Sequence, residues 1–284
     1  MSKRKVAIVI DSTANLPDKL VAQHQIYVVP QIVNWDGQSL LDGIDIKTEA
    51  FYAKLSMSQT SPTTSQPSPG EFLEHFQRVA ETADSIVGIF ISEHLSGTLS
   101  SARQAVSMMG DYPIEIVDSR SASMGLGLIA LAAAQAAADG KDYQEIAAIA
   151  RRIVPHLRVL FVVDTLEYLH RGGRIGGAKR LIGSVLSIKP VLHLEGGKIE
   201  PLASIRTKKK AVEHMLQVLQ QETAGKSQIH AAVMHAAAED EARRIADTIQ
   251  SAVQPLDIVQ GALSPVIGTH VGPGTLGVAY YAES

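Results

Sequence analysis

The sequence contains no cysteine among its 284 residues. This absence excludes disulfides, thiolate metal sites and cysteine nucleophiles. Its 10 histidines show neither the HExxH pattern nor another paired spacing that is typical of zinc ligands. We therefore expect a protein that holds no metal ion.

The sequence also lacks a long hydrophobic run. Its longest apolar tract, residues 124–138, is interrupted by Gly125, Gly127 and Gln135 and does not reach the ~18 consecutive apolar residues that a membrane span requires. The first residues, Met-Ser-Lys-Arg-Lys, lead directly into a short strand pattern without the apolar stretch of a secretory signal. We expect a cytoplasmic protein without a transmembrane segment, which makes at most transient contact with membranes.

An excess of basic charge is absent as well, because 26 Lys and Arg residues face 29 Asp and Glu residues, for a net charge of -3. Proteins that bind nucleic acid usually carry a basic face, so we expect no nucleic-acid partner. Apolar residues make up 45% of the chain and charged residues 19%. This composition allows a large buried core, and the length suggests two domains.

In the first half, short apolar runs alternate with helical patterns, which is typical of an α/β fold with a parallel sheet. We predict strands at residues 5–10, 26–30, 86–91 and 114–118, and a small strand excursion at residues 31–46. Helices are predicted at residues 15–25, with Asn15 as the cap, and at 48–57, 70–82, 102–109, 126–138 and 143–154. The loop at residues 59–69 contains three prolines, so we expect little regular structure there.

Pro155 and His156 mark a boundary between an N-terminal α/β domain, residues 1–157, and a C-terminal α+β domain, residues 158–284. In the second domain we predict a strand at residues 158–163 and a hairpin of residues 190–195 and 198–202. Further strands are predicted at residues 228–234, at 257–262 and around Gly272-Pro-Gly274. Helices are predicted from the Gly-rich loop 172–177 to about residue 188, after the cap Thr207, and at residues 239–253.

The stretch from Ser92 to Ser101 joins a predicted strand to a predicted helix. Its Ser96-Gly97-Thr98 run combines hydroxyl groups with free backbone N–H groups, which suits an anionic oxygen group. Ser and Thr are also favoured there as simple helix caps, so both interpretations stand. A nucleophilic serine is a weaker interpretation, because an α/β-hydrolase elbow has Gly where this chain has His94.

Two other loops are rich in hydroxyl groups. Thr63-Thr64-Ser65 by itself resembles the start of a turn, but its hydroxyls can donate to an anion without carrying charge. Ser119 to Ser123 follows a predicted strand, where open α/β sheets bind their ligands. If these loops converge on the Ser96 turn, they can share one anion.

Gly172, Gly173 and Arg174 offer flexible backbone N–H groups beside a fixed positive charge, a suitable cradle for an anion. His270 has glycines on both sides in Gly-Thr-His-Val-Gly-Pro-Gly. A single histidine is more often structural, but an imidazole can also protonate to complement an anion.

Arg206, Lys208, Lys209 and Lys210 form a basic cluster at a predicted helix start. An ordinary solvated face explains such a cluster, but cations are unfavourable at a helix N-terminus, which suggests another use.

Taken together, these stretches resemble the DegV family of bacterial fatty-acid-binding proteins. The resemblance covers essentially the whole chain through short motifs in family order: Asp11-Ser-Thr-Ala-Asn-Leu16, Thr64-Ser-Gln-Pro-Ser68, Leu95-Ser-Gly-Thr98, Val117-Asp-Ser119, Tyr168-Leu-His-Arg-Gly-Gly-Arg-Ile175, Ile188-Lys-Pro190 and Gly268-Thr-His-Val-Gly-Pro-Gly274. It implies the two-domain DegV-type fold, with a fatty acid between the domains and its tail enclosed in the second.

The resemblance also implies roles for residues. Thr64 and Ser96 are expected to hold the carboxylate, with support from Arg174 and His270. We include Gly97 in the carboxylate site, and the supporting positions are Ser65, Thr98, Ser119, Gly172 and Gly173. The expected ligand is a long-chain fatty acid, with no other cofactor and no catalytic residue.

The family delivers its fatty acid to a fatty acid kinase, and the acyl phosphate then passes to an acyltransferase of phospholipid synthesis. By this resemblance Arg206, Lys208 and Lys209 become a docking patch for the kinase. Glu93-His94 departs from the small polar residues expected there and leaves the partner open. We expect a monomer.

Two other classes of function stay open. One is an enzyme, either an acyl-ester hydrolase that uses Ser96 and His270 or a phosphotransferase that uses the Arg174 loop. The other is a regulatory module that senses a lipid and binds a partner through the basic cluster.

Overall fold

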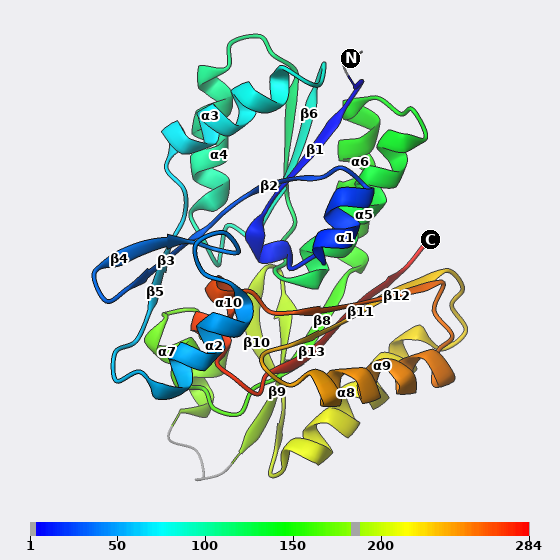
Figure 1. Ribbon diagram of the computed structural model, residues 1–284. Coiled ribbons are helices and arrows are strands. Elements are labelled where there is room, and N and C mark those ends of the chain that lie inside the picture. Colours follow the sequence, from blue (N-terminus) through cyan, green and yellow to red (C-terminus); the bar gives the residue numbers. More distant parts are fainter. Residues whose placement is uncertain (1–3, 183–187, 284) are drawn as a thin grey trace.

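Two β-sheets form the framework of the computed structural model, which describes residues 4–182 and 188–283 (Figure 1). The first sheet is parallel, with the order β2-β1-β6-β7. Its strands β1 and β6 are buried throughout, as expected for apolar runs that are covered on both faces. The sheet consists of β1 (Ala7–Asp11), β2 (Tyr27–Val29), β6 (Ile86–Phe90) and β7 (Ile114–Asp118).

Helices cover both faces of this sheet (Figure 1). On one face lie α3 (Pro69–Ala80) and α4 (Thr98–Met108), and on the other lie α5 (Met124–Ala138) and α6 (Tyr143–Ile153). The predicted burial of the α5 segment is confirmed, since most of its residues are buried. The helix α4 begins four residues before the predicted start at residue 102, directly after Gly97.

The second sheet is mixed, with the order β10-β9-β8-β13-β11-β12. Only its β11–β12 pair is parallel among the strand pairs of the described residues. The helices α8 (Lys208–Thr223) and α9 (Glu239–Ala252) cover one face, and Thr207 caps α8 as predicted. The strands are β8 (Arg158–Val162), β9 (Lys189–Glu195), β10 (Lys198–Ile205), β11 (Ile229–His235), β12 (Asp257–Ala262) and β13 (Leu276–Ala282).

A small third sheet confirms the predicted excursion and extends it. It has the order β4-β3-β5, formed by β3 (Ile32–Trp35), β4 (Gln38–Leu41) and β5 (Thr63–Ser65), and α2 (Thr48–Met57) lies between β4 and β5 in the chain. From here on, the excursion means residues 31–65. The expectation that residues 59–69 lack regular structure is wrong at β5. This short edge strand lies between Pro62 and Pro67, which are tolerated because they flank the paired residues.

The prediction that Asn15 caps a helix is wrong. Asn15 has a φ of 55° and ends the short 3-10 helix η1 (Ser12–Ala14), while α1 spans Asp18–Gln23 after Pro17. Asn tolerates this left-handed conformation better than most residues. Its side-chain oxygen also accepts a hydrogen bond from the Ser123 hydroxyl at 2.9 Å, so Asn15 links two loops.

The strands predicted around Gly272-Pro-Gly274 are replaced by one helix and one strand. The helix α10 spans Pro265–Val271, with Pro265 at its first position and Gly272 ending it at a φ of 75°. The strand β13 follows. Two short helices flank the glycine-rich loop: α7 (Glu167–Arg171) before it and the 3-10 helix η3 (Gly176–Leu181) at its end. The remainder of the helix predicted there, at residues 183–187, lies outside the described residues.

One hydrophobic cluster connects the excursion and the second sheet to α5, which covers the first sheet. It contains Trp35 and Phe51 from the excursion, Met124 from α5, and Phe161 and Leu192 from the second sheet. This cluster crosses the predicted boundary between residues 157 and 158, and that division stays a prediction. No helix in the described part of the chain is long and apolar enough to cross a membrane.

Gly268 lies where α10 packs against α2. A Cβ atom there would lie 2.5 Å from the Tyr52 hydroxyl oxygen and 2.8 Å from the Phe51 ring. We expect Gly268→Ala to lower the free energy of unfolding by about 1–3 kcal/mol, because this overpacking forces the two helices apart. Chemical denaturation measures the loss. Gly70→Ala in α3 is the control, because its new Cβ would meet nothing nearer than 3.9 Å; equal losses would contradict this explanation.

Candidate functional site

A cavity of about 90 Å³ lies among the three sheets. Its apolar wall comes largely from the second sheet and α10, and includes Phe161, Leu194, Met234, Val266 and Val271. Its polar wall comes from loops and from the excursion, and includes Thr13, Gln31, Thr64, Ser65, Gln66, Ser96, Ser123, Arg174 and His270. The cavity therefore suits a ligand with an apolar body and a polar group.

The topology of the first sheet explains why polar groups gather there. Thr13 follows β1, Gln31 follows β2, Ser96 follows β6 and Ser123 follows β7. Because the strands are parallel, all four loops emerge at the same edge of the sheet, where ligands of open α/β sheets bind. The structure brings together Thr64, Ser65 and Ser96, which all line the cavity; that they share one anion stays a prediction.

Thr64 and His270 form the most specific contact of the site. The Thr64 hydroxyl lies 2.7 Å from Nε2 of His270, and the two residues come from β5 and α10. Nδ1 of His270 is buried without a hydrogen-bond partner among the described residues. It packs against Gly172, where a Cβ atom would lie only 2.1 Å from Nδ1. Gly172 thus makes room for the imidazole rather than lining the cavity.

Burial, together with the positive charge of Arg174, lowers the pKa of His270 to about 4. The imidazole is therefore neutral near pH 7. The expectation that His270 protonates to complement an anion concerns the ligand-bound site and stays a prediction. A neutral imidazole can fix the direction of the Thr64 hydroxyl, either by accepting its proton or by donating to its oxygen.

Ser96 directly precedes Gly97, the N-cap residue of α4, which makes no side-chain capping bond. The Ser96 hydroxyl oxygen accepts a hydrogen bond from the Thr98 backbone N–H at 3.3 Å and lies 2.8 Å from the Thr98 hydroxyl. Ser96 also lines the cavity. Thr98 is buried behind it, where its hydroxyl accepts from the Gln31 amide at 2.8 Å. Thr98 therefore supports Ser96 and Gln31 from outside the cavity wall.

Gly97 allows a close approach of Gln66. A Cβ atom at position 97 would lie 2.7 Å from the Gln66 amide nitrogen. Gln66 lines the cavity and is a polar residue that sequence analysis missed.

Arg174 is held by two backbone carbonyl groups. Its Nε donates to Leu95 at 3.0 Å, and its Nη1 donates to Gly172 at 2.7 Å. These bonds fix the guanidinium between the Ser96 turn and α7. The site consequently has one fixed positive charge beside neutral hydrogen-bonding groups.

Two other supporting positions lie away from the cavity wall. Ser119 is buried and bonds within its own loop, donating to the Ser121 carbonyl at 3.2 Å and accepting from the Ser121 N–H at 3.1 Å. Gly173 adopts a φ of 70°, which helps the chain turn from α7 toward Arg174. Both shape loops rather than face the cavity.

Asp11 is a buried polar residue beneath the site that sequence analysis did not assign. It accepts hydrogen bonds from the backbone N–H groups of Thr13 at 3.0 Å and Ile91 at 2.8 Å, and from the Thr13 hydroxyl. Burial raises its pKa above the usual range. The position of Asp11 at the end of β1, directly before Ser12 and Thr13, was the available signal.

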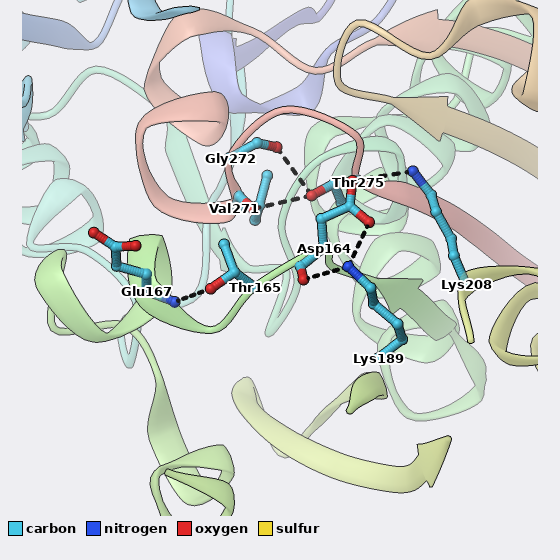
Figure 2. Close-up of polar contacts among 8 residues, drawn as sticks. All are labelled: Asp164, Thr165, Glu167, Lys189, Lys208, Val271, Gly272 and Thr275. Carbon is cyan, nitrogen blue, oxygen red and sulfur yellow. Dashed lines mark hydrogen bonds and ion pairs between the residues drawn. The ribbon is translucent and has the colours of Figure 1, made fainter. Parts of the chain in front are cut away.

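Only part of the basic cluster is exposed to solvent without an ion pair among the described residues. Arg206, Lys209 and Lys210 are exposed, whereas Lys208 forms an ion pair with Asp164 at 3.2 Å. Figure 2 shows Asp164 between Lys208 and Lys189, whose Nζ also lies 3.2 Å from the carboxylate. Within the described residues, no group of three or more His, Asp or Glu side chains is arranged to hold a metal ion.

The fold and the cavity define a class of α/β protein that can enclose an apolar ligand beside a polar wall. The sequence profile of the family described as "Uncharacterised protein, DegV family" matches residues 5–283. The chain belongs to the DegV family.

Relatives match over nearly the whole length. A DegV domain-containing protein of Clostridium acetobutylicum is 42% identical over 282 residues, 98% of each chain. Two solved structures are also similar. A fatty acid binding DegV family protein from Thermus thermophilus has a TM-score of 0.93 and 34% identity, over 98% of this chain and 100% of that chain. DegV, a fatty acid binding protein from Bacillus subtilis, has a TM-score of 0.92 and 32% identity, over 99% of this chain and 100% of that chain.

The low pKa of His270 predicts its titration directly. Its folded-state pKa of about 4 lies below the unfolded value near 6.5. The contribution of this residue to stability is therefore present above about pH 6.5 and is lost as the pH falls toward 4. We expect ¹⁵N NMR of the imidazole in the ligand-free protein to show a neutral ring down to about pH 5. A midpoint above pH 6 would contradict the burial argument.

Proposed function

We propose that this protein binds a long-chain fatty acid, with the acyl tail against the apolar wall and the carboxylate at Thr64 and Ser96. The observation that carries this proposal is a single cavity in which apolar residues of the second sheet meet uncharged donors and Arg174. The descriptions of the Thermus thermophilus and Bacillus subtilis relatives as fatty acid binding proteins support it.

Magnitudes support different roles for the two walls. Burying ~16 methylene groups at ~0.8 kcal/mol each gives on the order of 13 kcal/mol before association costs. Each hydrogen bond to the carboxylate contributes about 1.5–3 kcal/mol. The tail therefore supplies most of the affinity, and the hydroxyl groups determine which end of the ligand lies at the polar wall.

We further propose that the protein presents the carboxyl group to a fatty acid kinase. Phosphorylation forms a bond between a carboxylate oxygen and the γ-phosphorus of a nucleoside triphosphate, while the bond to the leaving diphosphate breaks. The polar wall includes Thr64, Arg174 and His270, which also line a second pocket of about 210 Å³ with Ser61 and Arg171. We propose this second pocket, which includes Arg171 and Arg174, as the route by which a phosphoryl donor would reach the carboxylate.

A hydrolase that uses Ser96 and His270 is less consistent with the geometry. Nε2 of His270 pairs with Thr64, and the Ser96 hydroxyl pairs with Thr98. A serine nucleophile requires a base within hydrogen-bond reach. The two side chains here bond to different partners, which favours binding over acyl transfer.

Ligand identification tests the binding proposal. We expect mass spectrometry of lipid extracts to find a long-chain fatty acid in the purified protein, or uptake of one from solution. Ser96→Ala should weaken binding about 10- to 100-fold, because one hydrogen bond to the carboxylate is lost. Ser100→Ala is the control, because Ser100 is exposed on α4, directly after the Ser96 turn. A protein that neither contains nor takes up fatty acid would refute the proposal.

Charge reversal tests the docking patch. Arg206→Glu with Lys209→Glu should reduce phosphorylation of the bound fatty acid by a fatty acid kinase at least tenfold, because opposite charges no longer attract the partner. Fatty acid affinity should stay unchanged. Lys19→Glu with Lys226→Glu, two exposed sites outside the patch, reverses the same number of charges and therefore controls for net charge. Equal rates for the wild type and the double variant would exclude this patch.

A further inference from the structure

The helix α10 carries His270 and contributes several residues to the cavity wall, yet it has only seven residues. A helix of this length has little stability of its own, since the cost of nucleation is spread over few hydrogen bonds. The position of His270 therefore depends on what holds the two ends of α10.

The N-terminal end of α10 is held by a residue far away in the sequence. The cap residue Ser264 makes no side-chain capping bond. Instead, Asp42, in the turn after β4, accepts a hydrogen bond from the Val266 backbone N–H at 3.4 Å. Asp42 also accepts from the Ser12 hydroxyl at 2.6 Å and is only 2% exposed. This carboxylate occupies the place of an N-cap, where negative charge is favourable.

The excursion makes a second contact with the same segment. The Tyr52 hydroxyl of α2 donates to the Leu263 carbonyl at 3.1 Å, directly before the start of α10. At the other end, the Thr275 hydroxyl lies 3.0 Å from the carbonyl oxygens of Val271 and Gly272 (Figure 2). The helix is thus held at both ends, and the excursion holds the end that carries no cap of its own.

Burial of the ionised Asp42 carboxylate lowers the stability of the folded protein. Burial, and to a smaller extent the charge of Asp11 on β1, raises the pKa of Asp42 to about 6. The other titratable group that faces it is Tyr52 on α2, whose own pKa is raised by burial and by Asp42. Because the folded pKa exceeds the unfolded value of 3.8, stability falls as the pH rises from about 4 to 6.

An amide could accept from the Val266 N–H through its oxygen and donate to the Ser12 hydroxyl oxygen through its nitrogen, without the cost of a buried charge. A carboxylate that lowers stability where an amide would serve is typical of a residue that acts in function.

We propose that Asp42 is a positioning residue of the fatty acid site: by capping α10 from the excursion, it fixes His270 against Thr64. This inference rests on the proposed binding function, because its effect is measured through fatty acid affinity. The geometry that supports it is the sequence of contacts from Asp42 to Val266, along α10 to His270, and on to Thr64.

The variant Asp42→Asn tests this role without removing a side chain. At pH 7.5 we expect Asp42→Asn to bind a long-chain fatty acid such as palmitate about fivefold more weakly than the wild type, because the charged cap is lost. The same variant should unfold at a higher temperature than the wild type at pH 7.5. Below about pH 5 both differences should vanish, because the wild-type carboxyl group is then protonated. A ratio of affinities that does not change with pH would overturn the proposal.

Asp45→Asn is the matched control. Asp45 lies in the same turn and accepts from the Leu41 backbone N–H at 2.8 Å, but it is exposed, and this hydrogen bond stays within the excursion. We expect it to leave fatty acid affinity unchanged across the pH range. A loss equal to that of Asp42→Asn would show that the turn as a whole, rather than the cap, determines affinity, and would also overturn the proposal.

A double-mutant cycle shows whether Asp42 acts through His270. In a His270→Ala background, we expect Asp42→Asn to cause no further loss of affinity, because the group that it positions is absent. Additive losses would refute the assignment. The wild-type titration separates this inference from the proposed function: if the wild type takes up no fatty acid, the function fails, whereas normal wild-type binding with additive losses refutes only the role of Asp42.

Discussion

The hydrogen bond between Thr64 and His270 is the contact on which the site depends. Its two residues belong to β5 and α10, and neither element is part of the two large sheets. The excursion brings Thr64 to the cavity through the pairing of β5 with β3, and it also packs Phe51 and Tyr52 of α2 against α10. One inserted unit thus supplies one partner of the contact and supports the helix that carries the other.

The two large sheets could be predicted from the sequence, because the patterns that indicate their strands lie within short stretches of the chain. Continuous apolar runs predict the buried parallel strands, and the hydroxyl loops follow those strands directly, so Ser96 could be placed beside the cavity. The strand β5 could not be predicted in this way, because Thr63 to Ser65 has no apolar alternation and pairs with residues about 30 positions earlier. The capping of α10 by Asp42 spans 224 residues, and no local pattern encodes it.

The electrostatics of the site explain why hydroxyl groups matter there. Asp11 and Asp42 are buried nearby, and His270 is neutral because of burial and Arg174. The Thr13 hydroxyl is committed to Asp11, so it cannot donate to a ligand. Among the described cavity residues, an anion would therefore rely on the hydroxyls of Thr64, Ser65 and Ser96 and on amide donors, with Arg174 as the fixed positive charge. Such a wall binds a single carboxylate without concentrating positive charge in an apolar cavity.

The far end of α10 connects this wall to the basic cluster. The turn after α10 contains Gly274, where a Cβ atom would lie 1.9 Å from the Asp164 carboxylate. Asp164 in turn pairs with Lys208 at the start of α8. Asp164 can approach this turn only because position 274 has no side chain. Lys208 consequently serves the internal structure, and a partner that contacts Arg206 would lie next to the turn that ends the helix of His270.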